Sequence, residues 1–218
     1  MQAIYEQYRP RTWGEVIGQE KAIKEVLNVA KRGLENRAFW ISGTSGTGKT
    51  TIAKLIAQEV ADPLDTVEVN GRDLKVADLK DLEWGWHYAT MSGKGHCLIV
   101  NESHGLGKPV IEYLLNLLEN LAAGKSGHAV VIFTTTLEGQ AMFDDKNIDS
   151  GPLGSRCIDI SLSTQGLCKA FARRAKEILT AEGLDGADIV HYERFLKDNG
   201  NNFRKLLEAG EKGKFSAE

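Results

Sequence analysis

The stretch that most constrains this chain is a glycine-rich loop at residues 43–50, which reads GTSGTGKT. It fits the pattern G-x-x-x-x-G-K-[ST], in which backbone N–H groups converge on phosphate oxygens. A short apolar strand pattern, AFWIS, precedes the loop, and a helical pattern, TTIAKLIAQEVA, follows it. A strand–loop–helix unit of this kind predicts a binding site for a nucleoside triphosphate, because the free N–H groups at the helix start attract phosphate.

Two side chains at the end of the loop have distinct expected roles. Lys49 is expected to bridge the β and γ phosphates, and the Thr50 hydroxyl is expected to bind Mg²⁺. Glycine is needed between them and the strand because the backbone must bend sharply toward the phosphates. The expected nucleotide-binding residues of this stretch are Gly43, Thr44, Ser45, Gly46, Thr47, Gly48, Lys49, Thr50 and Thr51.

The rest of the first 165 residues alternates between strand patterns and helix patterns. This alternation predicts an α/β fold with a parallel sheet and helices on both faces. The expected strands cover residues 38–42, 66–70, 97–102 and 128–136, with a short one starting at 156–160. The expected helices between them include residues 20–35, 50–61 and 110–122, where apolar residues recur at helical spacing.

Only helical patterns occur after about residue 166. They cover residues 166–183, 188–200 and 201–212. We therefore expect two units, a nucleotide-binding domain at 1–165 and a small all-helical lid domain at 166–218.

Composition excludes several classes of protein. The net charge of −3 provides no general basic field, so any contact with nucleic acid needs a local patch. The three cysteines form no CxxC pair, which argues against a zinc site and a disulfide framework. The N-terminus has no apolar signal region, and no apolar run reaches the ~20 residues of a membrane span. We expect a cytoplasmic protein without a membrane anchor.

Several further motifs follow one another along the chain. They are YRPRTWGEVIGQEKAI at 8–23, EVNGRD at 68–73, FTTT at 133–136 and LGSRC at 153–157. Together with the loop, they resemble the AAA+ ATPase subunits of sliding-clamp loaders. EVNGRD and the late NFRK at 202–205 are most similar to the clamp-loader subunits of tailed phages. The resemblance runs from about Tyr8 to Arg204 and implies a P-loop ATPase that uses ATP and Mg²⁺ in DNA replication.

The resemblance also implies roles for single residues. Thr136, or failing it Thr135, would be a sensor hydroxyl near the γ-phosphate, although a β-branched residue that merely ends a strand is the simpler interpretation. Arg204 would be a second sensor reaching the γ-phosphate from the lid, and a solvated helix charge is the alternative. The adenine pocket would be lined by Tyr8, Arg9, Pro10, Val16, Ile17 and Gly18, which could equally form a structural strap.

Arg156 would be an arginine finger that serves the ATP site of a neighbouring subunit. An arginine in this position stabilises charge on the transferred phosphoryl group. The simpler alternative is a surface arginine paired with Asp159. A finger that acts on a neighbour implies an oligomer.

The strand at 96–102, HCLIVNE, aligns with the family element that usually ends in Asp-Glu. Glu102 retains the second acid, which polarises the attacking water. Asn101 replaces the first acid; its amide oxygen accepts a hydrogen bond from a magnesium-bound water, but it carries no charge. We expect weaker Mg²⁺ binding and slower hydrolysis. A subunit that binds ATP without hydrolysing it remains the alternative.

The family also implies partners. These are a sliding clamp, the other loader subunits and primer-template DNA. The DNA phosphates would be contacted by Lys80, Lys94 or Lys108, and a solvated surface lysine is the simpler interpretation of each. The family's C-terminal collar domain is absent from these 218 residues. A phage-encoded chain would act in the host cytoplasm. Another AAA+ DNA motor, of the branch-migration or replication-maintenance type, is the second enzymatic interpretation.

Overall fold

A five-stranded parallel sheet forms the centre of the molecule. The computed structural model describes residues 2–90, 92–136 and 151–216. The strands lie in the order β2-β3-β4-β1-β5, and every neighbouring pair is parallel. Their bounds are β1 Arg37–Ser42, β2 Ala61–Asn70, β3 Gly95–Asn101, β4 Ala129–Thr135 and β5 Ile158–Ser161. The predicted α/β fold is confirmed.

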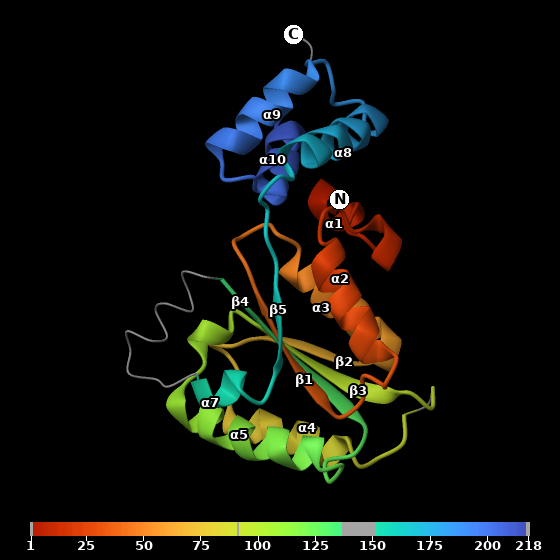
Figure 1. Cartoon of the computed structure of the whole chain (residues 1–218), viewed down its shortest axis with the longest axis vertical. Helices are drawn as coiled ribbons and strands as arrows, with labels where there is room; N and C mark the ends of the chain where they lie inside the picture. Colours follow the sequence, from red (N-terminus) through yellow and green to blue (C-terminus); the bar gives the residue numbers. More distant parts are fainter. Residues whose placement is uncertain (1, 91, 137–150, 217–218) are drawn as a thin grey trace.

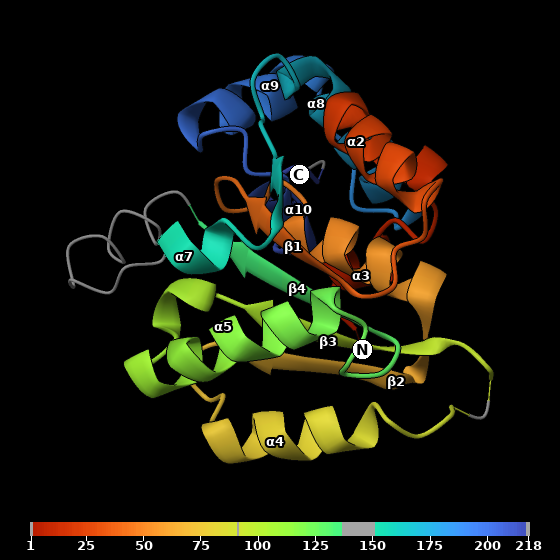
Figure 2. The same ribbon diagram turned by 60° about the horizontal axis from the view of Figure 1, so that its bottom comes forward.

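Helices cover both faces of this sheet (Figure 2). Helices α2 (Glu20–Ala30) and α3 (Lys49–Val60) lie on one face, and α4 (Val76–Gly85) and α5 (Lys108–Ala122) lie on the other. The interior strand β3 lies between β2 and β4, and its burial explains why its sequence is largely apolar. Cys97 and Ile99 pack into the core under α2 and α3, whereas Leu98 and Val100 pack into the core under α4 and α5. Both faces of the strand are buried, so no polar alternation remains.

The last three helices form a separate layer beyond the sheet (Figure 1). They are α8 (Cys168–Ala181), α9 (Ile189–Asp198) and α10 (Phe203–Glu211). Their own core includes the stacked rings of Tyr192 and Phe215, with centroids 4.2 Å apart. The short N-terminal helix α1 (Ile4–Gln7) packs here through the buried Ile4, so the start of the chain completes the core of its helical end.

Element bounds differ from the sequence expectations at several places. Strand β2 begins at Ala61 and not near Thr66, because an irregular pairing with β3 separates these two residues. Strand β5 begins at Ile158, after a turn that holds Arg156. The N-terminus, expected to be irregular, contains α1 and a 3-10 turn at Trp13–Glu15. The short helix α7 (Gly151–Gly154) precedes β5, and a second 3-10 turn covers Ser103–Gly105.

The three cysteines are unpaired. Cys97 is buried in the core, and this burial raises the pKa of its thiol to about 12. None of the described helices is long and apolar enough to cross a membrane.

Candidate nucleotide site

The glycine-rich loop connects β1 to α3 at the carboxyl end of the sheet. Gly48 caps the start of α3 in the left-handed region, at φ 97°. Gly46 also has a positive φ, 81°, and a Cβ there would collide with the side-chain oxygen of Asn202. Asn202 is buried and caps α10 by accepting a hydrogen bond from the Lys205 N–H at 3.1 Å. The loop is therefore held in contact with the helical unit, and glycine is required at this contact.

An open cavity of about 830 Å³ lies where this loop meets the strand ends. Thr136 lines it at the end of β4, and Arg204 lines it from α10. The remaining lining residues are Tyr5, Tyr8, Arg9 and Pro10; Ser45, Gly46, Gly48, Lys49, Thr50 and Thr51; and Asn101, Glu102, Thr134 and Phe203. The cavity thus gathers most of the residues that the sequence singled out.

A second cavity of about 610 Å³ adjoins the first and is more apolar. Tyr8, Pro10, Val16 and Ile17 line it together with side chains of the helical unit. Those side chains are Phe171, Arg174, Ile178 and Phe203, and the loop contributes Gly46, Thr47 and Gly48. A mostly apolar cavity beside a phosphate-binding loop has the properties that an adenine ring requires.

Two residues expected in the adenine pocket lie elsewhere. Arg9 lines the larger, polar cavity, where its guanidinium donates a hydrogen bond to the Thr51 hydroxyl at 3.1 Å and pairs with Glu6. The hydrogen bond from Arg9 lowers the pKa of Glu6. Gly18 lines neither cavity; it has φ 73° and packs closely against Leu167 of the helical unit.

Lys49 is buried at the base of the loop, with 8% of its surface exposed. Its ammonium group donates hydrogen bonds to the carbonyl oxygens of Gly43 at 3.0 Å and Thr44 at 2.9 Å. Gly43 and Thr44 do not line either cavity, so these two residues contribute carbonyl groups that hold Lys49.

The end of β4 places alternate threonines on opposite sides. Thr134 and Thr136 line the larger cavity, whereas the Thr135 hydroxyl lies 3.4 Å from His104 Nδ1. Side chains alternate along a strand, which explains why Thr136 reaches the cavity and the alternative sensor, Thr135, does not. Thr134 was not singled out from the sequence, although the same alternation in the run TTT could have indicated it.

Asn101 and Glu102 follow one another at the end of β3. Asn101 donates to Glu68 Oε1 at 2.7 Å and accepts from the Thr134 hydroxyl at 2.9 Å. Glu102 has a left-handed backbone, with φ 51° and ψ 49°, and its carboxylate lies 3.3 Å from His104 Nε2. Neither Glu68 nor His104 was expected here, because both contacts depend on how neighbouring segments fold.

Arg204 and Arg156 lie in different surroundings. The Arg204 guanidinium lies 5.0 Å from the centre of the Tyr5 ring, in the wall of the larger cavity. Arg156 lines neither nucleotide cavity of its own chain. It pairs with Glu119 on α5 and donates to the Pro152 carbonyl at 2.8 Å. The alternative pairing with Asp159 was therefore wrong, because Glu119 is the carboxylate that meets the guanidinium.

Metal ligation by histidine or cysteine has no support in the described residues. They contain no group of three or more His, Cys, Asp or Glu side chains that could hold a metal ion. The Thr50 hydroxyl and the Asn101 amide oxygen, the two predicted Mg²⁺ ligands, both belong to residues that line the larger cavity.

The fold and this site define a P-loop protein that binds a nucleoside triphosphate at the carboxyl edge of a parallel sheet. Residues 39–149 match the family described as "ATPase family associated with various cellular activities (AAA)". This match covers half of the chain, and the chain belongs to this family. The expected AAA+ fold is confirmed.

Curated relatives give a more specific likeness. The chain is 29% identical over 141 residues to DNA polymerase III subunit tau of Escherichia coli. The match covers 54% of this chain and 22% of that protein. It is 25% identical over 209 residues to DNA polymerase III subunit gamma of Buchnera aphidicola subsp. Acyrthosiphon pisum. This match covers 84% of this chain and 54% of that protein. The chain thus spans between about a fifth and about half of the curated relatives that it matches.

A solved structure of a related fold is the Thermotoga maritima RuvB Holliday junction branch migration motor. It has a TM-score of 0.67 and 24% identity, and the match covers 94% of this chain and 64% of that chain. At this identity the likeness shows the fold alone.

Proposed function

We propose that this chain is an ATP-hydrolysing subunit of a DNA sliding-clamp loader that acts in DNA replication. One observation carries this proposal: a single cavity gathers Lys49, Glu102 and Thr136 with Arg204 from the helical unit. The curated relatives named as DNA polymerase III tau and gamma subunits supply the replication context. The motifs YRP, EVNGRD and SRC support the same assignment.

Within this proposal, each cavity residue has one task in ATP hydrolysis. Lys49 and the loop N–H groups bind the phosphates, and Glu102 polarises the attacking water. Thr136, after the end of β4, and Arg204, on α10, contact the γ-phosphate. The adenine ring occupies the adjoining apolar cavity, against Tyr8, Pro10, Val16 and Ile17.

The donor set of the cavity fits Mg²⁺. The Thr50 hydroxyl and the Asn101 amide oxygen are hard oxygen ligands, and Mg²⁺ usually takes few protein ligands beside phosphate oxygens and waters. Asn101 is neutral, so the phosphates provide the negative charge. When held by these residues, Mg²⁺ would supply positive charge that offsets the charge of the phosphates. We expect Mg²⁺ to bind more weakly than it would to a site with an aspartate.

The helical unit acts as a lid on the nucleotide, and we assign residues 1–165 and 166–218 to the two domains. Asn202, at the N-terminal cap of α10, touches the loop, and Arg204 on α10 lines the cavity. The position of this helix therefore depends on whether a nucleotide is bound. Arg156 serves the ATP site of a neighbouring subunit. The partners are a sliding clamp, other loader subunits and primer-template DNA, with Lys80, Lys94 and Lys108 as phosphate contacts. Lys94 pairs with Asp62 at 3.4 Å, so the Lys94 contact requires an exchange of partners.

The direct test is Mg²⁺-dependent ATP hydrolysis at micromolar protein, with and without primer-template DNA. Lys49→Ala is the control for contaminating ATPases, because this side chain anchors the phosphates. We expect turnover that rises with DNA and disappears in Lys49→Ala. Bound ATP with no turnover above the control would contradict an ATPase and favour a subunit that only binds nucleotide.

A branch-migration motor is the second candidate, because AAA+ DNA motors of that type share the phosphate-binding loop, the sensor residues and the arginine finger. Primer-template DNA together with a sliding clamp separates the two. A loader subunit should hydrolyse ATP faster when both are present, whereas stimulation by four-way junction DNA alone would favour the motor.

A further inference from the structure

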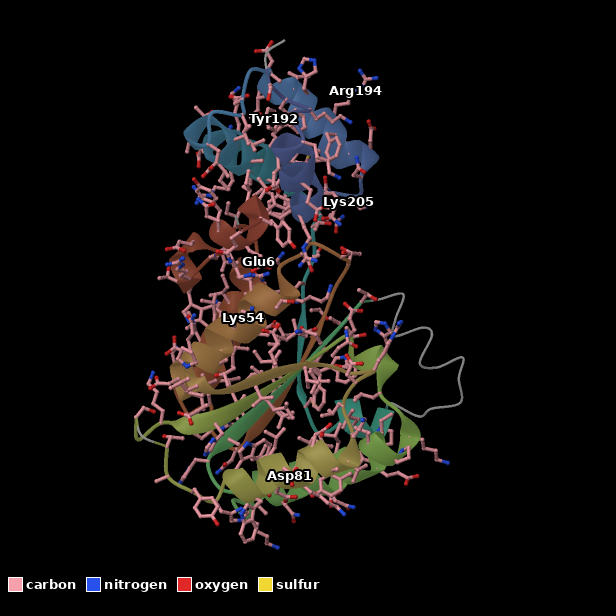
Figure 3. All side chains as sticks on the ribbon, turned by 180° about the vertical axis from the view of Figure 1, so that it is seen from behind. Glu6, Lys54, Asp81, Tyr192, Arg194 and Lys205 are labelled. Carbon is pink, nitrogen blue, oxygen red and sulfur yellow. The ribbon has the colours of Figure 1, made fainter. Side chains whose placement is uncertain are left out.

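The N-terminal helix α1 lies between the helical unit and the nucleotide-binding sheet. Figure 3 shows α1, with Glu6 labelled, between the helical unit and helix α3, on which Lys54 is labelled. The buried side chain of Ile4 anchors α1 in the core of the helical unit. Just after α1, the Tyr8 hydroxyl donates a hydrogen bond at 2.7 Å to the carboxylate of Glu182, the capping residue at the end of α8. These contacts fix α1 to the helical unit.

Helix α1 supports the Arg204 side chain through the ring of Tyr5. Helices α1 and α10 pack against each other, and the Arg204 guanidinium lies 5.0 Å from the centre of the Tyr5 ring. A cation at this distance is attracted by the negative face of an aromatic ring. Tyr5 and Arg204 both line the larger cavity, so this contact lies at the edge of the space for the nucleotide.

Among the described residues, three cationic side chains line the larger cavity, and they differ in what their N–H groups bind. Lys49 donates to two carbonyl oxygens of its own loop. Arg9 donates to the Glu6 carboxylate and to the Thr51 hydroxyl. The Arg204 guanidinium forms no hydrogen bond or ion pair with any residue that the structure describes, and the Tyr5 ring is its neighbour. Its donors are therefore not used within this part of the chain.

A ring and a carboxylate hold an arginine in different ways. A carboxylate accepts hydrogen bonds from the N–H groups of the guanidinium, whereas an aromatic ring attracts its charge and leaves the N–H groups to other acceptors. An unsupported arginine side chain also samples many rotamers, and ordering it subtracts from the affinity of any contact that it makes. A ring that orders the guanidinium in advance reduces this loss.

We propose that Tyr5 is a positioning residue for Arg204, whose guanidinium its ring holds at the cavity wall with the N–H groups ready for the γ-phosphate of ATP. This inference rests on the proposed function, in which Arg204 contacts that phosphate. ADP has no γ-phosphate, so the Tyr5 contact increases the preference of the site for ATP over ADP. Since α1 and α10 share one packed core, the ring and the guanidinium stay together when the helical unit moves.

Two substitutions of Tyr5 test the role of the ring. Tyr5→Leu keeps an apolar side chain at the contact with α10 but removes the ring, whereas Tyr5→Phe keeps the ring. The primary measurement is the equilibrium affinity for ADP and for the β,γ-imido analogue of ATP, both with Mg²⁺, which needs no turnover. We expect Tyr5→Leu to bind the ATP analogue about three- to tenfold more weakly, with the ADP affinity within about twofold of the parent chain. Tyr5→Phe should restore the parent affinity for both nucleotides.

A double variant tests whether Tyr5 acts through Arg204. Arg204→Gln alone should remove most of the preference for the ATP analogue over ADP. Adding Tyr5→Leu to Arg204→Gln should cause no further loss, because the two side chains contribute through one contact. Tyr88→Leu is the matched control: Tyr88 is exposed after α4 and lines neither nucleotide cavity, so its loss should leave both affinities unchanged.

Three results would overturn the inference. Equal losses for both nucleotides in Tyr5→Leu would mean that the ring only stabilises the helical unit. A gain in affinity for the ATP analogue would mean that the ring competes with the phosphate for the guanidinium. Additive losses in the double variant would mean that Tyr5 acts independently of Arg204. Tyr5→Met takes the place of Tyr5→Leu if the latter does not fold. Absent hydrolysis together with the expected affinities would contradict the ATPase proposal only.

Discussion

The position of the Glu102 carboxylate depends on an unusual backbone conformation. It follows the last residue of β3 in a left-handed conformation, which costs a non-glycine residue about 1–3 kcal/mol. His104, two residues later, lies 3.3 Å from the Glu102 carboxylate and also approaches the Thr135 hydroxyl. The carboxylate lies in the cavity wall and stays 44% exposed, so water can reach it. This combination suits a group that polarises an attacking water.

Glu102→Gln should separate binding from chemistry. The amide keeps the size of the side chain but cannot act as a base, so we expect hydrolysis to fall about 10²–10⁴-fold while ATP affinity changes little. Single-turnover hydrolysis and equilibrium nucleotide binding check the two parts. Glu112→Gln, on the exposed side of α5, is the control and should behave like the parent chain. Equal hydrolysis by Glu102→Gln and the parent would exclude Glu102 as the base.

At the scale of elements, Asp185 connects α8 to α9. Its carboxylate accepts from Lys176 at 2.8 Å, from Tyr192 at 2.8 Å and from Thr180 at 3.0 Å. Burial acts to raise the pKa of Asp185, but these hydrogen bonds outweigh it and lower the pKa to about 2. The loop between the two helices is therefore held by one ionised side chain.

The lowered pKa of Asp185 predicts a dependence of stability on acid. A carboxylate whose pKa is lower in the folded chain stabilises it above the unfolded pKa near 3.8, and that contribution disappears as pH falls toward 2. It amounts to about 1–2 kcal/mol, since solvent screens part of it. Asp185→Asn should lower the free energy of unfolding at pH 7. The difference in this free energy between the variant and the parent chain should become smaller as the pH falls from 4 to 2. Denaturant melts across this range, with Asp198→Asn as control, measure it. A constant difference would contradict the assignment.

At the scale of the whole molecule, Arg156 lies apart from the nucleotide cavities of its own chain. Arg156 lines neither nucleotide cavity and pairs with Glu119 near the surface. A guanidinium that is one third exposed and held by one carboxylate can exchange that partner at small cost, since exposed ion pairs contribute about 0–1 kcal/mol. Such an arginine suits a contact made with the next subunit.

Mixing two inactive variants tests this assignment. Arg156→Ala keeps the ATP site but has no finger, whereas Lys49→Ala keeps the finger but lacks the phosphate anchor. Each alone should lose about 10³-fold or more in hydrolysis, and their mixture should regain measurable activity where a finger meets an intact site. Steady-state rates against mixing ratio provide the measurement. Glu119→Gln is the control, because it releases the guanidinium without removing it. Full activity of Arg156→Ala would refute the role in a neighbour's site.

The fold was predictable because its signals are local. Apolar runs such as CLIV in β3, the loop GTSGTGKT and the helical spacing of α2 each depend on residues that are close in sequence. The irregular start of β2 was not predictable, because its pairing with β3 breaks between Ala61 and Thr66. The position of α1 against the helical unit likewise depends on residues at the opposite end of the chain.

The sequence by itself determined that this chain has a phosphate-binding loop, a parallel sheet and a helical end, since periodicity and glycine placement act over a few residues. Only the tertiary structure decided what surrounds Asn101. Glu68, Asn101 and Thr134 lie on three different strands, and which side chains meet depends on strand order and register. The tertiary structure likewise decided that Arg156, in the turn before β5, pairs with Glu119 of α5 and not with Asp159, because the two residues lie far apart in the sequence.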